Sequence, residues 1–192
     1  MTAVQIISVV STLKYELGIP LVKNYQERIS LFQISIINTV LISFFIFFLI
    51  KVYFLLGFSS NSNLKTLIYV IPTGVILMSL FHQILYNWLL YKQKFSYISI
   101  AKISFGFAYA ILPIGLYKIA NLKGFFYLVV SHQIGLLLGI LSIILLSSRK
   151  LTFKNLTLFF TLKTKNLINI LRKYKKYVLF SSPSTLMNTI SI

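Results

Sequence analysis

Hydrophobic positions along the chain gather into four long blocks, which short polar connections separate. A helix of about 20 residues, rising 1.5 Å per residue, is long enough to cross a hydrocarbon core of about 30 Å. Each block reaches that length, and none contains an Asp or Glu. The predicted spans are residues 31–50, 67–91, 98–117 and 124–146. The pattern therefore predicts an all-α fold, a polytopic transmembrane helix bundle that occupies residues 1–146.

Two further apolar stretches lie at the ends of the chain. Residues 1–13 are too short to span a bilayer, and they lack both the basic start and the small-residue cleavage site of a signal peptide. We expect them to form a partial span. Residues 177–192 begin like another membrane segment and are interpreted as its truncated start. On this interpretation the chain is an incomplete set of helices.

Basic residues alternate between the connections. Fifteen of the 19 Lys and Arg residues precede the first span, follow the fourth, or lie between the second span and the beginning of the third, with Lys102 counted just inside it. The other two connections hold the remaining four. Positive charge resists translocation, so the richer connections are predicted to be cytoplasmic and the protein to lie in a cell membrane.

Residues 147–176 form the most basic connection. Leu167, Leu171 and Tyr174 recur at i, i+4 and i+7, which predicts an amphipathic helix that lies along the cytoplasmic headgroups. Such a helix would serve as a linker between two helical bundles. The alternative is a solvated basic loop that only obeys the positive-inside rule.

Composition excludes several classes of protein. The chain is 57% hydrophobic, and its net charge of +17 lies in connections between spans rather than on one soluble basic face, so nucleic acid is not an expected partner. Without cysteine there is no disulfide, thiolate nucleophile or Cys-based metal site. The sequence has no Gly-rich phosphate loop, metal-ligand cluster or nucleophile with a nearby base. We therefore expect neither an enzyme nor a cofactor or metal site, and the expected surroundings are membrane lipids.

Four segments, in order, resemble a known family: TLKYELGIPL at 12–21, QILYNWLLYKQKF at 83–95, QIGLLLG at 133–139 and YKKYVLFSSPS at 174–184. They are similar to segments of bacterial oligosaccharide flippases, which export O-antigen and capsule repeat units. This family belongs to the multidrug/oligosaccharidyl-lipid/polysaccharide export superfamily. Its signature residues fall on Lys14, Tyr15 and Glu16.

The resemblance implies a fold and a substrate. The chain would correspond roughly to helices 2–7, the N-terminal bundle of a two-bundle transporter in the bacterial inner membrane. The two bundles would rock around a central cavity. The implied partners are a polyprenyl-pyrophosphate-linked oligosaccharide and a second bundle or neighbouring glycan-assembly proteins. Two alternatives stay open: a small non-transporting integral subunit that packs against another membrane protein, and an exporter of another solute from the same superfamily.

Polar side chains inside the spans are the candidates for a substrate cavity, because unpaired polar groups are costly in hydrocarbon. They are His82, Gln83, Asn87, Lys102, His132 and Gln133, with Gln33 and Asn38 on another helix. Both histidines lie in spans that run inward, separated by about 10 Å in depth. The structural alternative is a neutral histidine that is hydrogen-bonded between packed helices. Lys102 lies near the end of its span and can extend to the cytoplasmic interface instead.

Other residues have structural interpretations. Gly135 and Gly139 form a GxxxG spacing that predicts close helix packing. Pro72 and Pro113 are expected to kink their spans or to act as hinges. Lys14 and Glu16 lie two residues apart, which on a helix points them in different directions and predicts no direct ion pair.

Overall fold

The computed structural model describes residues 2–56, 67–119, 126–148, 167 and 169–175. Every regular element in this part of the chain is a helix. The helices are α1 (Thr2–Ser11), α2 (Tyr25–Leu55), α4 (Leu67–Ser79), α5 (Tyr86–Tyr91), α6 (Phe95–Ile119) and α7 (Phe126–Ser148). A 3-10 turn (Tyr15–Gly18) follows α1, and a π-helical segment (Leu80–Leu85) joins α4 to α5. The truncated span predicted at 177–192 lies outside the described residues, as does most of 147–166.

Four helical stretches are long and apolar enough to cross a membrane: Tyr25–Leu55, Ile68–Tyr91, Phe95–Tyr117 and Tyr127–Leu146. They coincide with the four predicted blocks. The main difference is the start of the first span, at residue 25 instead of 31. There Asn24 caps α2 by accepting a hydrogen bond from the Gln26 amide, so that the helix begins in a polar stretch that hydropathy leaves out.

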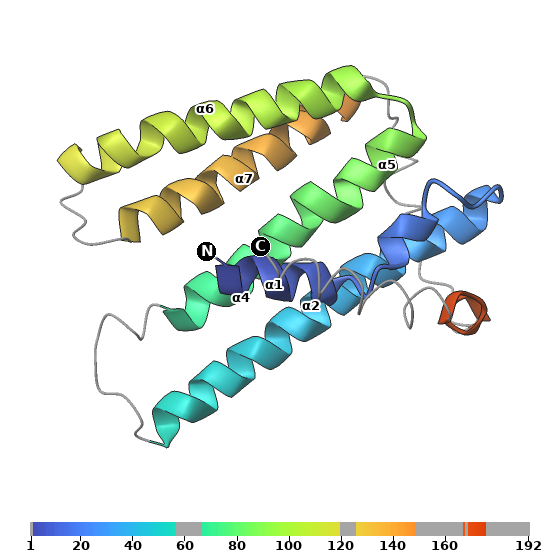
Figure 1. Cartoon of the computed structure of the whole chain (residues 1–192), viewed down its shortest axis with the longest axis horizontal. Coiled ribbons are helices and arrows are strands. Elements are labelled where there is room, and N and C mark those ends of the chain that lie inside the picture. Colours follow the sequence, from blue (N-terminus) through green and yellow to red (C-terminus); the bar gives the residue numbers. More distant parts are fainter. Residues whose placement is uncertain (1, 57–66, 120–125, 149–166, 168, 176–192) are drawn as a thin grey trace.

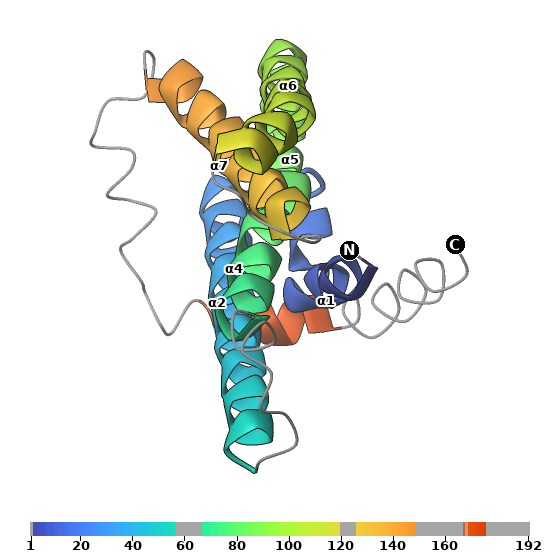
Figure 2. The same cartoon turned by 90° about the vertical axis from the view of Figure 1, so that its left-hand side faces the viewer.

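Figures 1 and 2 show α4 and α5 between α2 and an antiparallel pair formed by α6 and α7. The short helix α1 packs mainly on α4, to one side of this layer. At one end of the molecule lie the start of α2, the junction of α5 with α6, and residues 169–175 (Figure 1, right). The connections predicted to be cytoplasmic are therefore together at one end, as the alternation of charge requires.

The glycines of α7 allow the close packing that their spacing predicts. A Cβ atom on Gly139 would lie 2.6 Å from the Phe81 ring, and one on Gly135 would lie 3.2 Å from the Phe105 ring. The prediction for Pro72 and Pro113 stays open. Both lie inside helices, and the irregular turn of the second span falls at Leu80–Leu85 instead.

Residues 169–175 are helical, which is one of the two alternatives for this connection, and their apolar side packs against protein. Leu167 and Ile170 are buried in a core cluster with Tyr15, Ile19 and Leu31, and the outward Arg172 is exposed. The helix is also held at Glu27, which accepts hydrogen bonds from Lys173 Nζ (2.8 and 2.9 Å) and Tyr174 Oη (3.0 Å). The described part of the basic connection is therefore a docked helix, and its apolar face is not free to enter the headgroup layer.

Candidate functional site

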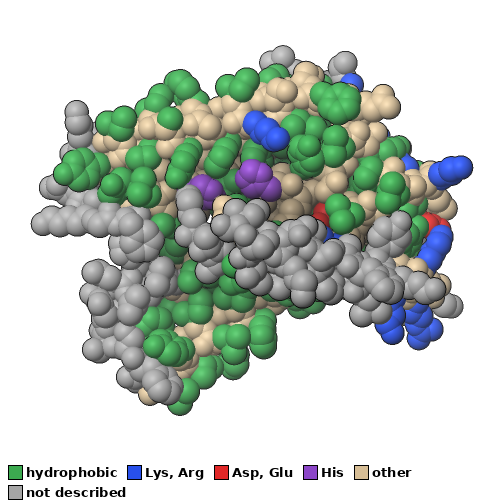
Figure 3. Space-filling model, in the orientation of Figure 1, with side chains coloured by type: hydrophobic (Ala, Val, Ile, Leu, Met, Phe, Trp, Pro, Cys, Tyr) green, Lys and Arg blue, Asp and Glu red, His purple; other side chains and the backbone are tan. Residues whose placement is uncertain are grey.

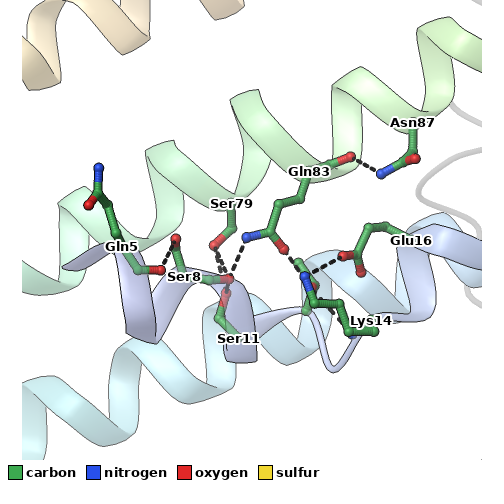
Figure 4. Close-up of polar contacts among 9 residues, drawn as sticks. Gln5, Ser8, Ser11, Lys14, Glu16, Ser79, Gln83 and Asn87 are labelled. Atoms are coloured by element: carbon green, nitrogen blue, oxygen red, sulfur yellow. Dashed lines mark hydrogen bonds and ion pairs between the residues drawn. The ribbon is translucent and has the colours of Figure 1, made fainter. Parts of the chain in front are cut away.

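A buried network of polar side chains joins α1 to α4 and the π-helical segment (Figure 4). We call it the polar junction; it consists of Ser8, Ser11, Thr12, Ser79 and Gln83. The hydroxyls of Ser11 and Ser79 lie 2.6 Å apart, and Thr12 Oγ1 donates to Gln83 Oε1 at 2.8 Å. Gln83 Nε2 in turn donates to the Ser8 carbonyl at 2.8 Å. Both ends of the Gln83 amide are thus engaged in holding two helices together.

The other amide candidates also make bonds within the chain. Asn87 Nδ2 donates to the Gln83 carbonyl one turn earlier, at 2.8 Å (Figure 4). Gln133 Nε2 donates across to the Val70 carbonyl at 2.6 Å, which ties α7 to α4. Asn38 differs, since its Nδ2 atom is buried and has no hydrogen-bond partner in the described structure. The amides of Gln83 and Gln133 therefore hold helices together, whereas that of Asn87 bonds within its own helical stretch.

The segment around Lys14, Tyr15 and Glu16 folds into a tight turn, and one prediction about it was wrong. Lys14 Nζ lies 3.8 Å from Glu16 Oε1, although we expected no direct ion pair. That expectation assumed an α-helix. Lys14 instead has φ 60° and caps a 3-10 turn, and this brings the two side chains onto the same side. Glu16 is 1% exposed, and its second carboxylate oxygen has no hydrogen-bond partner among the described residues. Burial raises the pKa of its carboxyl against the opposing effects of Thr12 and Lys14.

The two histidines lie apart from the polar junction, around the aromatic rings of α6. The ring centroids of His82 and His132 are 5.9 and 5.5 Å from that of Phe105, both in edge-on geometry. His132 also meets Tyr109 at 5.6 Å, and Phe105 stacks on Tyr109. We call these residues the histidine face. His82 is exposed, and Figure 3 shows histidine side chains at the surface among hydrophobic ones.

Lys102 extends the histidine face toward the basic end of the molecule. Its Nζ atom lies 5.1 Å from the centroid of the Tyr86 ring, and the side chain is exposed. A cleft with room for about one water molecule lies beside it. The lining residues are Phe81, His82, Tyr86, Leu89, Ile98, Ala101, Lys102 and Ile143. This cleft is too small for a sugar, so a larger ligand at this position would lie on the face.

The aromatic members of this face escaped prediction. Lys102, Phe105 and Tyr109 follow one another at i, i+3 and i+7, which places them on one side of α6. In a span rich in Phe and Tyr, that spacing does not separate ligand-facing rings from lipid-facing rings. The sequence did hold one signal for a ligand-facing side of this helix, which is the presence of a lysine at the same helical spacing as the two rings.

We compared the chain with models of protein families, with curated proteins and with solved structures, and none of them matches it. What the site does must therefore be argued from its residues and their geometry.

Proposed function

We propose that this chain forms part of the wall of a bacterial inner-membrane transporter that flips lipid-linked oligosaccharide repeat units for polysaccharide synthesis. The proposal starts from the four segments that resemble the flippase family. It treats the chain as one bundle of a two-bundle machine, with the histidine face directed toward the other bundle.

The observation that carries the proposal is the convergence in space of three of these segments, the first, second and fourth. Tyr15 and Ile19, from the first segment, are buried in the same cluster against which Trp88 and Tyr91 of the second segment pack. Tyr174, the first residue of the fourth segment, packs on that cluster too. Residues more than 150 positions apart in the sequence thus form one structural unit, which is what a shared family architecture requires and a chance likeness does not.

The histidine face supplies chemistry that suits the substrate. A pyrophosphate-linked oligosaccharide must carry charge and hydroxyl groups through hydrocarbon, where each unpaired polar group costs several kcal/mol. Imidazoles and an ammonium group offer hydrogen-bond donors for phosphate oxygens, and rings such as Phe105 and Tyr109 offer flat surfaces for sugars. Among the described residues, neither acid lies on this face, since Glu16 pairs with Lys14 and Glu27 with Lys173.

The test is genetic and uses the full reading frame in its own host. Inactivation should abolish the surface glycan and leave lipid-linked repeat units on the inner leaflet, and the wild-type gene should restore both. His82→Gln and His132→Gln should fail to restore the glycan although the protein accumulates normally. Thr73→Ala, a change at an exposed hydroxyl that bonds only to its own helix, is the matched control.

Each other outcome identifies an alternative. Surface glycan that is unchanged by inactivation would overturn the flippase proposal and favour export of another solute or a subunit role. An antibody against residues 151–176 separates these two, because a subunit would co-purify in stoichiometric amounts with a larger membrane protein. If the glycan is lost on inactivation but both histidine variants restore it fully, the flippase proposal stands. The histidine face then has no part in its mechanism.

A further inference from the structure

The turn between α5 and α6 presents two lysines beside a group of aromatic rings at the basic end of the molecule. Gln93, with φ 53°, reverses the chain between Lys92 and Lys94. Lys92 Nζ lies 5.3 Å from the centroid of the Tyr91 ring and 5.7 Å from those of Tyr25 and Trp88. These rings come from the start of α2 and the end of α5, so that two helices build the site. Lys94 Nζ lies near another ring, 5.8 Å from the centroid of Tyr97.

The positive charge of this site is not neutralised within the described structure. Beneath Tyr91 lies a further cation, the buried Arg28 guanidinium, 3.4 Å from the ring centroid. Its Nε donates to the Ile19 carbonyl at 3.0 Å and its Nη2 to the Val22 carbonyl, so it is held by neutral groups. The acids Glu16 and Glu27 pair elsewhere, with Lys14 and Lys173. Lys92 and Lys94 are both exposed, and neither forms an ion pair with a described carboxylate.

The surroundings of the lysines are apolar and open. Phe95, directly after Lys94, is 60% exposed, and Tyr25 is 43% exposed. Three helices that are long enough to span a membrane begin or end at this site, which places it where hydrocarbon meets headgroups. Tyr and Trp side chains favour that layer because their rings are apolar and their polar ends are hydrated. A ligand that matches this combination has a negative headgroup and an apolar body.

We propose that Lys92 and Lys94 bind the phosphate of an anionic phospholipid, while the Tyr25, Trp88 and Tyr91 rings contact the glycerol and the upper acyl chain. The inference depends on the membrane-spanning helices and not on the flippase function. A free phosphate ion would use the lysines but would not cover the exposed rings of Tyr25 and Phe95. A phospholipid accounts for both the lysines and the aromatic rings of the site, and it is the ligand that we propose.

Trp88 makes the site measurable, because it is the only tryptophan in the chain. The full chain is reconstituted in phosphatidylcholine vesicles in which part of the lipid is replaced by brominated phosphatidylglycerol, or by brominated phosphatidylcholine at the same mole fraction. Bromine on the acyl chains quenches tryptophan on contact. We expect phosphatidylglycerol to quench Trp88 at a lower mole fraction than phosphatidylcholine does, and this preference to shrink as salt is added.

The variants assign the preference to the site. A lysine close to the headgroups contributes about a fivefold preference for an anionic surface. The preference is measured as the ratio of the mole fractions of phosphatidylcholine and phosphatidylglycerol that give equal quenching. Lys92→Gln should reduce this ratio about fivefold, and adding Lys94→Gln should reduce it further. Lys51→Gln removes an exposed lysine from the other end of α2 and should leave the ratio unchanged. Equal quenching by the two lipids, or a preference that survives in the double variant, overturns the proposal. Inorganic phosphate that abolishes the preference at millimolar concentration and constant ionic strength overturns it in favour of a general anion site.

Discussion

Two neighbouring residues of one π-helical segment belong to opposite kinds of surface. Gln83 is buried in the polar junction, with both ends of its amide bonded to α1 or the turn that follows it. His82 is exposed on the histidine face, where it meets the rings of Phe81 and Phe105. The polar junction is closed, and its hydrogen bonds are made within the chain. Among the described residues, His82 and Lys102 of the histidine face are exposed, where they could meet a ligand or another protein surface.

The difference separates two uses of polarity in a membrane helix. Polar groups that bond across helices replace water as partners and fix the packing. Polar groups directed outward are costly there and indicate a ligand or a partner. Consecutive residues of a helix point about 100° apart, so that one short segment can serve both surfaces. The junction should therefore govern stability, and the histidine face activity.

The largest expected effect is a loss of stability from Gln83→Leu. The substitution removes two interhelical hydrogen bonds and leaves the Thr12 hydroxyl without its acceptor, which should cost about 2–3 kcal/mol. Unfolding in mixed micelles of increasing dodecyl sulfate fraction measures this. The adjacent His82→Gln should change stability by less than about 0.5 kcal/mol, as surface substitutions do. A larger loss in His82→Gln than in Gln83→Leu would reverse the assignment of the two surfaces.

The next effect concerns the packing beneath the histidine face. Gly139→Ala places a methyl group 2.6 Å from the Phe81 ring, and overpacking of this kind costs about 1–3 kcal/mol. Since Phe81 directly precedes His82, the variant should also disturb the face that Gln83→Leu leaves intact. Gly115→Ala, on α6, meets no atom of the described residues within 4 Å and is the matched control. Equal melting temperatures of the two alanine variants would show that the close contact with Phe81 does not contribute to stability.

Sequence pattern predicted the helices well and the surfaces poorly. The four spans follow from length and hydropathy, and the GxxxG contact follows from residue size. The division between Gln83 and His82 could not be predicted, because hydropathy and spacing do not tell which side of the span meets α1. The docked helix at 169–175 was predicted as amphipathic from Leu167, Leu171 and Tyr174. Its partner was not, because an apolar stripe suits a lipid surface and a protein surface equally well.

A smaller effect on stability should come from the pH dependence of the turn that carries Lys14 and Glu16. Burial raises the pKa of the Glu16 carboxyl above its ordinary value of 4.5. The folded state then favours the protonated form, so the stability contributed by this group is complete below pH 4.5 and is lost as pH rises through the raised pKa. For one proton the slope is at most about 1.4 kcal/mol per pH unit. Subtracting the pH profile of Glu16→Gln from that of the wild type isolates it, and a difference that rises with pH would contradict the sign.

The smallest effect is expected where the helix at 169–175 is held to the bundle. The Lys173 ammonium group donates to Glu27, which raises the pKa of Lys173, but both side chains reach solvent. Glu27→Gln should therefore leave the global melting temperature unchanged while amide hydrogen exchange in residues 169–175 becomes faster, because the pair is lost and the apolar contacts remain. Ile170→Ala, which weakens the buried side of the same helix, should accelerate exchange more than Glu27→Gln does. The reverse order would mean that the ion pair, and not apolar packing, keeps this helix docked.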